Sequence, residues 1–264
     1  MEKDDQKVNS IEKAMEIILK FQEVKPSWGI RELSSELGFS PATVQRILQV
    51  LKTYEFVRQD PKSRQYYIGN IFYRFLENLN NANDLVRIGR PFLEEVAAAT
   101  LETVHLSVIE QNYRLCIDHI ESPKVLKAGM PIGNKAPLYT GASAKCLLAF
   151  SSEDFQDNYI RTTEMKPLTN NTIVLTGKLF EELYKIKEQG YAISLGERTP
   201  GLGSISAPVF DHNGQILASL SVAIPEVRLR YEDHQANCID VLLRTAAAFS
   251  KAMGLTEPYH NQRS

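Results

Sequence analysis

The stretch that decides the fold of the N-terminal part is ELGFSPATVQRIL, residues 36–48, where a glycine and a proline separate two segments of helical character. Gly38 lies where helix ends commonly take a left-handed residue, and Ser40 can cap the free N–H groups of the next helix. Pro41 fits the first position of that helix, where its missing N–H group costs nothing. The stretch predicts two short helices joined by a tight turn.

The second of these helices has one apolar and one polar face. Its apolar residues recur at the spacing i, i+3, i+4, i+7 and are Val44, Ile47, Leu48 and Leu51. The open face carries hydroxyl, amide and guanidinium groups, which can bond phosphates or base edges in a major groove. We expect DNA contacts from Ser40, Ala42, Thr43, Gln45, Arg46 and Gln49. Because any three-helix bundle exposes similar residues, the helices alone leave plain solvation as an alternative.

A further helix is expected before this pair, in SIEKAMEIILKFQEV, residues 10–24, with Ser10 as its N-cap. Its helical spacing predicts one apolar stripe, formed by Ile11, Met15, Ile18 and Leu19. The middle helix, in GIRELSSELG, places Ile30, Leu33 and Leu37 on one face. Three helices in this order are typical of a helix-turn-helix domain.

The next stretch, EFVRQDPKSRQYYIG, predicts two strands, 56–59 and 65–68, joined by a turn at 60–63. Lys62 and Arg64 lie at its tip, as a basic wing that can grip phosphates beside the recognition helix. Residues 40–74 carry six basic and two acidic side chains, a local charge of +4. Charge alone would also fit a solvated face, but with the helices it predicts a winged helix-turn-helix domain, residues 1–69, that binds a double-stranded DNA operator.

The segment NIFYRFLENLNNAND, residues 70–84, predicts a linker helix over 70–83. Its apolar stripe is rich in aromatic residues and consists of Ile71, Phe72, Phe75, Leu76 and Leu79. This stripe either packs against the winged domain of its own chain or pairs with the same helix of a second subunit. Because proteins that bind two symmetric DNA half-sites do so as dimers, the second alternative predicts a homodimer.

Residues 84–264 predict an antiparallel sheet flanked by helices, so that the whole chain is of the α+β class. Period-two alternation marks strands in TVHLSVIE and YRLCIDHIES, and a second hairpin surrounds the turn at Asn213-Gly214. Helices are expected near 85–100, 142–150, 177–189 and 231–253. This second domain is long enough to bury its own core.

The chain shows no pattern of an enzyme, a metal site or a cofactor site. It has no nucleophile motif, phosphate-binding loop or dinucleotide glycine pattern, and its three cysteines are widely spaced. His105 and His119 are interpreted as structural, because Asp118 and His119 point to opposite faces of a strand. No apolar run approaches the roughly 18 residues of a membrane span, and the N-terminus lacks a secretory pattern, so we expect a cytoplasmic protein.

One stretch, PLYTGASAKCLLAF, suggests a small-molecule site. Its helix opens on small residues, so that free N–H groups and the positive end of the helix dipole can face an anion. These residues are Thr140, Gly141, Ala142 and Ser143. The alternative is a helix start capped by Thr140 through its own backbone.

The whole pattern resembles the IclR family of bacterial transcriptional regulators. The resemblance rests on the winged segment, on IESPKVLKAGMPIGNKAPLY, and on GYAISLGERTPGLGSISAPVFDHNGQILASLSVAIP, and it covers about residues 8–253 in the family's order. It implies a GAF-like α/β effector domain that binds a small metabolite, frequently a carboxylate from a catabolic pathway. It also implies dimers on palindromic operators, often paired into tetramers, and frequently repression.

The resemblance carries further effector positions over to this chain, namely Met130, Ser194, Ser204, Ser221 and Ala223. Two of them depart from the family, which commonly has Asp at the position of Ser194 and a second Ser at that of Ala223. Fewer polar partners predict a larger or more apolar effector. Two rival functions stay open on the residues alone: an enzyme with a GAF-like domain, and a wing used only for protein contacts.

Overall fold

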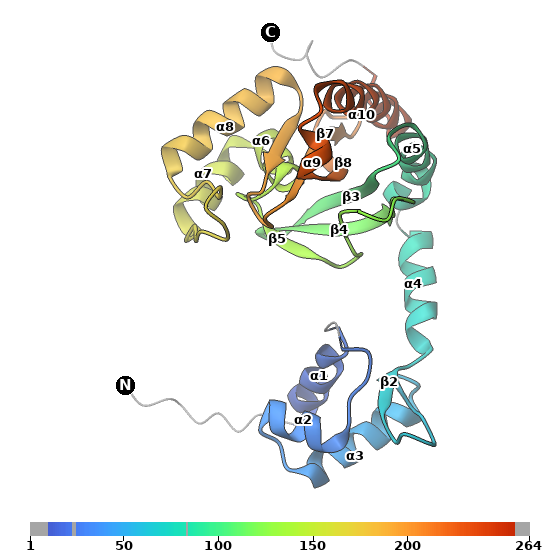
Figure 1. The fold of residues 1–264 in the computed structure, drawn as a ribbon. Helices are drawn as coiled ribbons and strands as arrows, with labels where there is room; N and C mark the ends of the chain where they lie inside the picture. Colours follow the sequence, from blue (N-terminus) through green and yellow to red (C-terminus); the bar gives the residue numbers. More distant parts are fainter. Residues whose placement is uncertain (1–9, 23–24, 83, 257–264) are drawn as a thin grey trace. The chain divides into compact units, whose positions relative to one another are not determined.

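The computed structural model of the 264-residue chain describes residues 10–22, 25–82 and 84–256. The chain forms two compact units, the first ending at Ala82 and the second following it (Figure 1). Each unit has its own hydrophobic core. None of the described helices is long and apolar enough to cross a membrane.

The first unit is a winged helix-turn-helix, as the sequence predicts. Its elements are α1 (Ser10–Lys20), α2 (Ile30–Leu37), α3 (Pro41–Thr53), β1 (Val57–Gln59), β2 (Tyr66–Ile68) and α4 (Ile71–Ala82). Gly38 ends α2 with a φ of 69°, and the Ser40 hydroxyl accepts the Thr43 N–H at 3.2 Å at the start of α3. The four apolar positions of α3 are buried, and β1 and β2 pair antiparallel. The predicted turn and recognition helix are therefore confirmed.

The predicted apolar stripe of α1 is wrong in its orientation. Ile11, Met15 and Leu19 are 70%, 53% and 54% exposed, whereas Ile17 is completely buried. The core is contacted by the neighbouring face, formed by Ala14, Ile17, Ile18 and Phe21. Apolar residues occur on both faces of this helix, so spacing alone could not choose between them. An exposed apolar row on α1 is the result.

The aromatic side of α4 packs on the winged domain of its own chain. Phe72 meets the ring of Phe56 edge-on with 5.6 Å between centroids, and Phe75 lies 6.2 Å from the same ring. Leu76 is nevertheless 43% exposed, and the side chain of Leu79 lies outside the described residues. Packing within the chain thus accounts for part of the stripe and leaves part of it to solvent.

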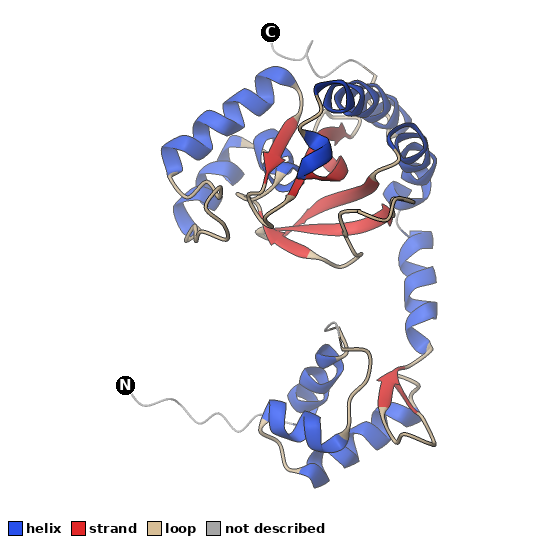
Figure 2. Cartoon of the chain, viewed as in Figure 1, coloured by secondary structure: helices blue, strands red, loops and turns tan. Residues whose placement is uncertain are grey.

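The second unit is a six-stranded antiparallel sheet in the order β5-β4-β3-β8-β7-β6, with helices on both faces (Figure 2). Its strands are β3 (Thr103–Glu110), β4 (Tyr113–Ile120), β5 (Lys135–Pro137), β6 (Ala192–Leu195), β7 (Leu202–Phe210) and β8 (Ile216–Pro225). Its helices are α5 (Asp84–Thr100), α6 (Ala142–Phe150), α7 (Glu153–Thr162), α8 (Thr176–Gln189), α9 (Glu226–Leu229) and α10 (Glu232–Ala252). The core between α5, α10 and the sheet is separate from the core around α6, α7 and α8.

Four short or polar elements were not among the predicted ones: α7, α9, β5 and β6. Helix α7 starts at a Ser152 cap that accepts the Phe155 N–H, but it buries only Gln156 and Tyr159. It therefore lacks the apolar periodicity by which the other helices are detected. Strands β5 and β6 lie at the two edges of the sheet and have three and four residues. Strands of that length leave too little alternation to be predicted.

Candidate DNA interface and ligand cavity

Helix α3 separates the residues of its two faces completely. Val44, Ile47, Leu48 and Leu51 fill the core, while Gln45, Arg46 and Gln49 are exposed. Ala42 is exposed and Thr43 half-buried, and the Ser40 and Thr43 hydroxyl oxygens lie 2.8 Å apart. All six predicted DNA-contact residues therefore lie at the start of α3 or on its polar face. This surface has the donors and acceptors that major-groove recognition requires.

The wing tip is shaped by a single carboxylate. Asp60 Oδ1 accepts the N–H groups of Lys62 and Ser63 at 3.0 and 2.6 Å, and the Ser63 hydroxyl at 2.9 Å. Hydrogen bonds from Ser63, first through its backbone, lower the pKa of Asp60. Lys62 and Arg64 are exposed, and in the described part of the chain neither forms an ion pair. Both charges are thus available to phosphates.

Three further basic residues lie beside the wing, although the sequence suggested them only as part of a local charge. Lys52, Arg58 and Arg74 line a surface hollow of about 450 Å³ between α3, the wing and α4. The Arg58 guanidinium lies 4.7 Å from the centre of the Tyr67 ring, which holds it in place. The basic surface therefore extends beyond the two wing residues.

The second unit contains a partly open cavity of about 70 Å³ beside the start of α6. Seven of the nine predicted effector residues line it, namely Met130, Thr140, Gly141, Ser143, Ser194, Ser204 and Ala223. Ala142 does not line it, but its N–H donates to the Ser204 hydroxyl at 3.3 Å. Ser221 lies away from the wall, where it accepts a hydrogen bond from Ser206 at 2.7 Å. Residues from four separate segments thus converge on one space.

A carboxylate of the protein, that of Glu197, accepts hydrogen bonds at the start of α6. The Gly141 N–H donates to Glu197 Oε2 at 3.0 Å, and Lys145 Nζ donates to Glu197 Oε1 at 2.6 Å. Lys145 is 1% exposed and also donates to Glu182 at 2.7 Å. Thr140 does not cap the helix, because its hydroxyl donates to the Pro137 carbonyl. The alternative of a cap by Thr140 is therefore wrong, and Glu197 binds the Gly141 N–H instead.

Two arginines, which sequence reasoning missed, form the charged wall of the cavity. Arg114 comes from β4 and Arg198 from the segment between β6 and β7. Each donates to Asn134 Oδ1 at 2.9 Å. Burial, and then the like charge of Arg198, lower the pKa of Arg114 to about 10. Both remain cations at neutral pH, so the wall is positively charged.

The cavity is covered by residues 121–134, here called the cover loop, which contribute Ala128, Gly129 and Met130. A buried carboxylate anchors this loop: Glu102 accepts two hydrogen bonds from Arg228 at 2.6 Å and one from Lys124 at 2.9 Å. Arg228 also donates to the Leu126 carbonyl at 2.9 Å. Burial raises the pKa of Glu102, but hydrogen bonds from Arg228 and Lys124 outweigh it and keep that pKa below its ordinary value.

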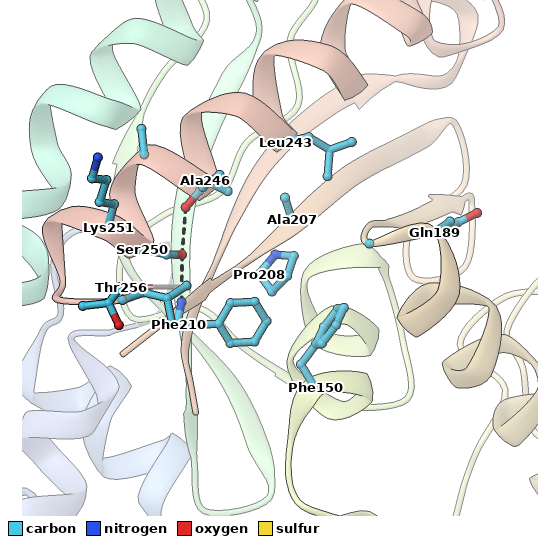
Figure 3. A pocket seen from close by; sticks show the side chains of 14 residues that line it. Phe150, Gln189, Ala207, Pro208, Phe210, Leu243, Ala246, Ser250, Lys251 and Thr256 are labelled. Atoms are coloured by element: carbon cyan, nitrogen blue, oxygen red, sulfur yellow. Dashed lines mark hydrogen bonds between the residues drawn. The ribbon is translucent and has the colours of Figure 1, made fainter. Parts of the chain in front are cut away.

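A larger cavity, of about 610 Å³, lies between α8, α10 and β7 (Figure 3). Its wall is mostly aromatic and small apolar side chains, including Phe150, Pro208, Phe210 and Leu243. Ser250 in this wall donates to the Ala246 carbonyl and accepts the Phe210 N–H, so its hydroxyl has its partners within the fold. The smaller cavity, with its charged and converging polar groups, is therefore the better candidate for a metabolite.

The other acidic and cysteine side chains of this unit that could take part in chemistry are paired or buried within the fold. Asp118 pairs with Arg90 at 3.0 Å, and the described cysteines Cys116, Cys146 and Cys238 are buried and free. Among the described residues no group of three or more His, Cys, Asp or Glu could hold a metal ion. A recognition helix, a basic wing and a ligand-sized cavity in a second unit instead define a DNA-binding transcriptional regulator.

The chain belongs to the IclR family of bacterial transcriptional regulators. The IclR helix-turn-helix domain matches residues 10–61, and the Bacterial transcriptional regulator IclR C-terminal domain matches residues 78–251. The chain is similar to the HTH-type transcriptional regulator KdgR of Escherichia coli (strain K12), with 33% identity over 263 residues, 99% of this chain and 97% of that one. This relative is named as a transcriptional regulator and not as an enzyme.

Two solved structures extend the comparison. The crystal structure of the Thermotoga maritima IclR covers 93% of this chain and 99% of its own, with a TM-score of 0.81 and 29% identity. An IclR homolog from Microbacterium hydrocarbonoxydans, solved in complex with 4-hydroxybenzoate, covers 93% of this chain and 99% of its own. Its TM-score is 0.78 at 14% identity, so this second likeness shows the fold alone.

Proposed function

We propose that this regulator represses a catabolic operon and that a small-molecule carboxylate, bound in the cavity beside α6, alters its affinity for the operator. The observation that carries the proposal is a partly open cavity lined by seven predicted effector residues and by two arginine cations. A guanidinium matches a carboxylate in charge and shape. The homolog that binds 4-hydroxybenzoate, an aromatic carboxylate, supports this choice. Because it would bind bacterial DNA, the protein would act in the cytoplasm.

The cavity revises the expectation of a larger or more apolar effector. Its volume of about 70 Å³ suits a compact group, and its wall contains Arg114 and Arg198. A compact, charged effector therefore fits better than an apolar one. Binding alters DNA affinity only if the effector has different affinities for the DNA-bound and DNA-free states.

The proposal includes a homodimer on a symmetric operator, with tetramers as pairs of dimers. Support comes from apolar side chains at the surface of the first unit: Met15 and Leu19 on α1 and Leu76 on α4 are 53%, 54% and 43% exposed. Exposed apolar side chains of this size are candidates for burial in a subunit interface. Sedimentation velocity of Met15→Lys and Leu76→Lys variants tests this, and the wild type should sediment as a dimer or larger. Monomeric wild-type protein would contradict it.

The DNA-binding surface can be tested without knowing the operator. A duplex is first selected from a random-sequence library with the full-length protein, and its affinity is then measured at several salt concentrations. Arg46→Ala is expected to cost about 1–3 kcal/mol and to relax the base preference at one position. Lys62→Ala should weaken binding to all sequences and lower the slope of log K against log salt by about 0.9.

The matched control is Lys185→Ala, which removes an exposed lysine from α8 in the second unit. It should leave both the affinity and the salt slope unchanged. Unaltered binding by the Arg46 and Lys62 variants would refute the assignment. The effector is tested with the same duplex: addition of a small carboxylate, pyruvate or malonate, should change its affinity in the wild type. A response to neutral sugars alone would argue against a carboxylate.

A further inference from the structure

The two arginines of the cavity wall share one acceptor. Arg114 and Arg198 each donate to Asn134 Oδ1 at 2.9 Å, and Arg114 also donates to the Asn134 carbonyl at 3.1 Å. Arg114 is 1% exposed, and its Nε–H has no partner among the described residues. Two guanidinium groups normally meet at a carboxylate, but the shared oxygen here belongs to a neutral amide.

Among the described residues, no acidic side chain forms an ion pair with either arginine. Across the described ranges, 10–22, 25–82 and 84–256, neither arginine has a carboxylate oxygen within 4 Å. The chain neighbour of Arg198, Glu197, uses its two oxygens for Lys145 and for the Gly141 N–H. Burying a cation without a counter-charge is costly, so a site of this kind is better matched to an anionic ligand than to an empty state.

A histidine close to the two arginines, His105, is uncharged. His105 is completely buried on β3, and in the described part of the chain neither of its ring nitrogens has a partner. Burial, followed by the charges of Arg114 and Arg198, lowers the pKa of His105 well below its ordinary value. The imidazole is therefore neutral at physiological pH and adds no charge beside the two guanidinium groups.

Building on the proposed carboxylate effector, we infer that the ligand is a compact dianion whose two negative charges are taken up by Arg114 and Arg198. A dicarboxylate and a phosphate monoester share this chemistry, since each presents several oxygens to the forked donors of a guanidinium. The Arg114 Nε–H is buried and has no partner among the described residues, so this guanidinium keeps an unsatisfied donor. The cavity volume of about 70 Å³ favours a ligand with a compact anionic group.

Calorimetric titration of the full-length protein tests the inference with four probes: malonate, inorganic phosphate, acetate and glycerol, at one ionic strength and pH 7.5. Malonate or phosphate should bind at least about tenfold tighter than acetate, because the second charge adds charge-assisted hydrogen bonds. Preference for malonate would indicate dicarboxylates, and preference for phosphate would indicate phosphate monoesters. Glycerol should not bind measurably.

Substitutions of the two arginines test whether they cause the preference for a dianion over acetate. Arg198→Gln and Arg114→Gln should each abolish the preference of dianion over acetate, and Arg198→Lys should restore part of it. Arg161→Gln, which removes an exposed arginine of α7, is the control and should bind like the wild type. If Arg114→Gln fails to fold, the Arg198 variants alone decide the question. Arg198 is only partly buried, so its replacement should disturb folding less.

Two results would overturn the inference. Equal affinity for malonate and acetate, unchanged in the arginine variants, would leave the cavity as an effector site but remove the requirement for two charges. Absence of binding by both malonate and phosphate would also refute it. In either case the operator titrations with pyruvate and malonate still decide the proposed function by themselves.

Discussion

Replacing Glu102 by Gln is expected to destabilise the second unit and to leave the first unit unchanged. Glu102 is completely buried and accepts hydrogen bonds from Arg228 and Lys124, which fix the cover loop above the cavity. Glutamine keeps the size of the side chain but removes its negative charge. The charge-assisted bonds are then weakened, and two cations lose their counter-ion.

The magnitude follows from the exposure of the two cations. A cation left wholly buried without its partner typically costs about 3–5 kcal/mol. Arg228 and Lys124 keep 20% and 32% of their side chains exposed, so water can replace part of the lost interaction. We therefore expect a cost of about 2–3 kcal/mol. At a urea dependence of about 2–3 kcal/mol per M, the unfolding midpoint would fall by about 1 M.

The assay uses the position of the single tryptophan. Trp28 lies in the core of the first unit, so its fluorescence reports unfolding of that unit, whereas far-UV circular dichroism reports both. Urea titration of Glu102→Gln should shift the dichroism transition but not the fluorescence transition. Glu121→Gln is the matched control, because Glu121 forms an exposed pair with Lys127 on the same loop.

The pH dependence gives a second check with a definite sign. Because the folded pKa of Glu102 lies below its ordinary value, its contribution is complete above the unfolded pKa of about 4.3 and is lost as the pH falls through the folded value. The stability difference between wild type and Glu102→Gln should therefore shrink in acid below about pH 4. An unshifted midpoint at pH 7, or equal shifts in both signals, would refute the reasoning.

Three further predictions concern single residues. Ser40→Ala removes the cap that accepts the Thr43 N–H, and Trp28 fluorescence in urea should show a loss of about 1 kcal/mol. Gly203→Ala would place a Cβ 2.3 Å from Leu229 Cδ2, and dichroism should show a loss of about 1–3 kcal/mol. In the wild type, stability should fall below about pH 6.5 by at most about 1.4 kcal/mol per pH unit, because His105 takes up a proton only on unfolding; His105→Leu should remove this slope.

Each of these changes has a matched control in the same unit. Ser35→Ala alters an exposed serine of α2 and should not lower stability. Gly129→Ala adds a Cβ that meets no atom within 4 Å, so it should be tolerated. His212→Leu removes an exposed histidine and should keep the slope below pH 6.5. If a control and its test variant behaved alike, the proposed contact would not be the cause.

Much of the first unit could be predicted because its decisive contacts are local. The cap of Ser40, the left-handed Gly38 and the apolar face of α3 all lie within about a dozen residues, where helical periodicity is a strong indicator. The buried face of α1 could not be predicted, since its sequence is apolar on more than one side. Arg114 and Arg198 were missed for another reason: only the strand order of the sheet brings residues so distant in sequence to one amide.

The charge balance of the cavity changes what the departure at Ser194 means. The loss of the acid that the family commonly has there predicted, by itself, a more apolar effector. Ser194, Arg114 and Arg198 line the same cavity, so an acid at position 194 would have supplied negative charge to a wall that now has none from the protein. Glu197 cannot replace it, because its oxygens are engaged by Lys145 and the Gly141 N–H. Under the proposed dianionic effector, the ligand would supply this negative charge, and the same substitution that removes a polar partner would favour an anion.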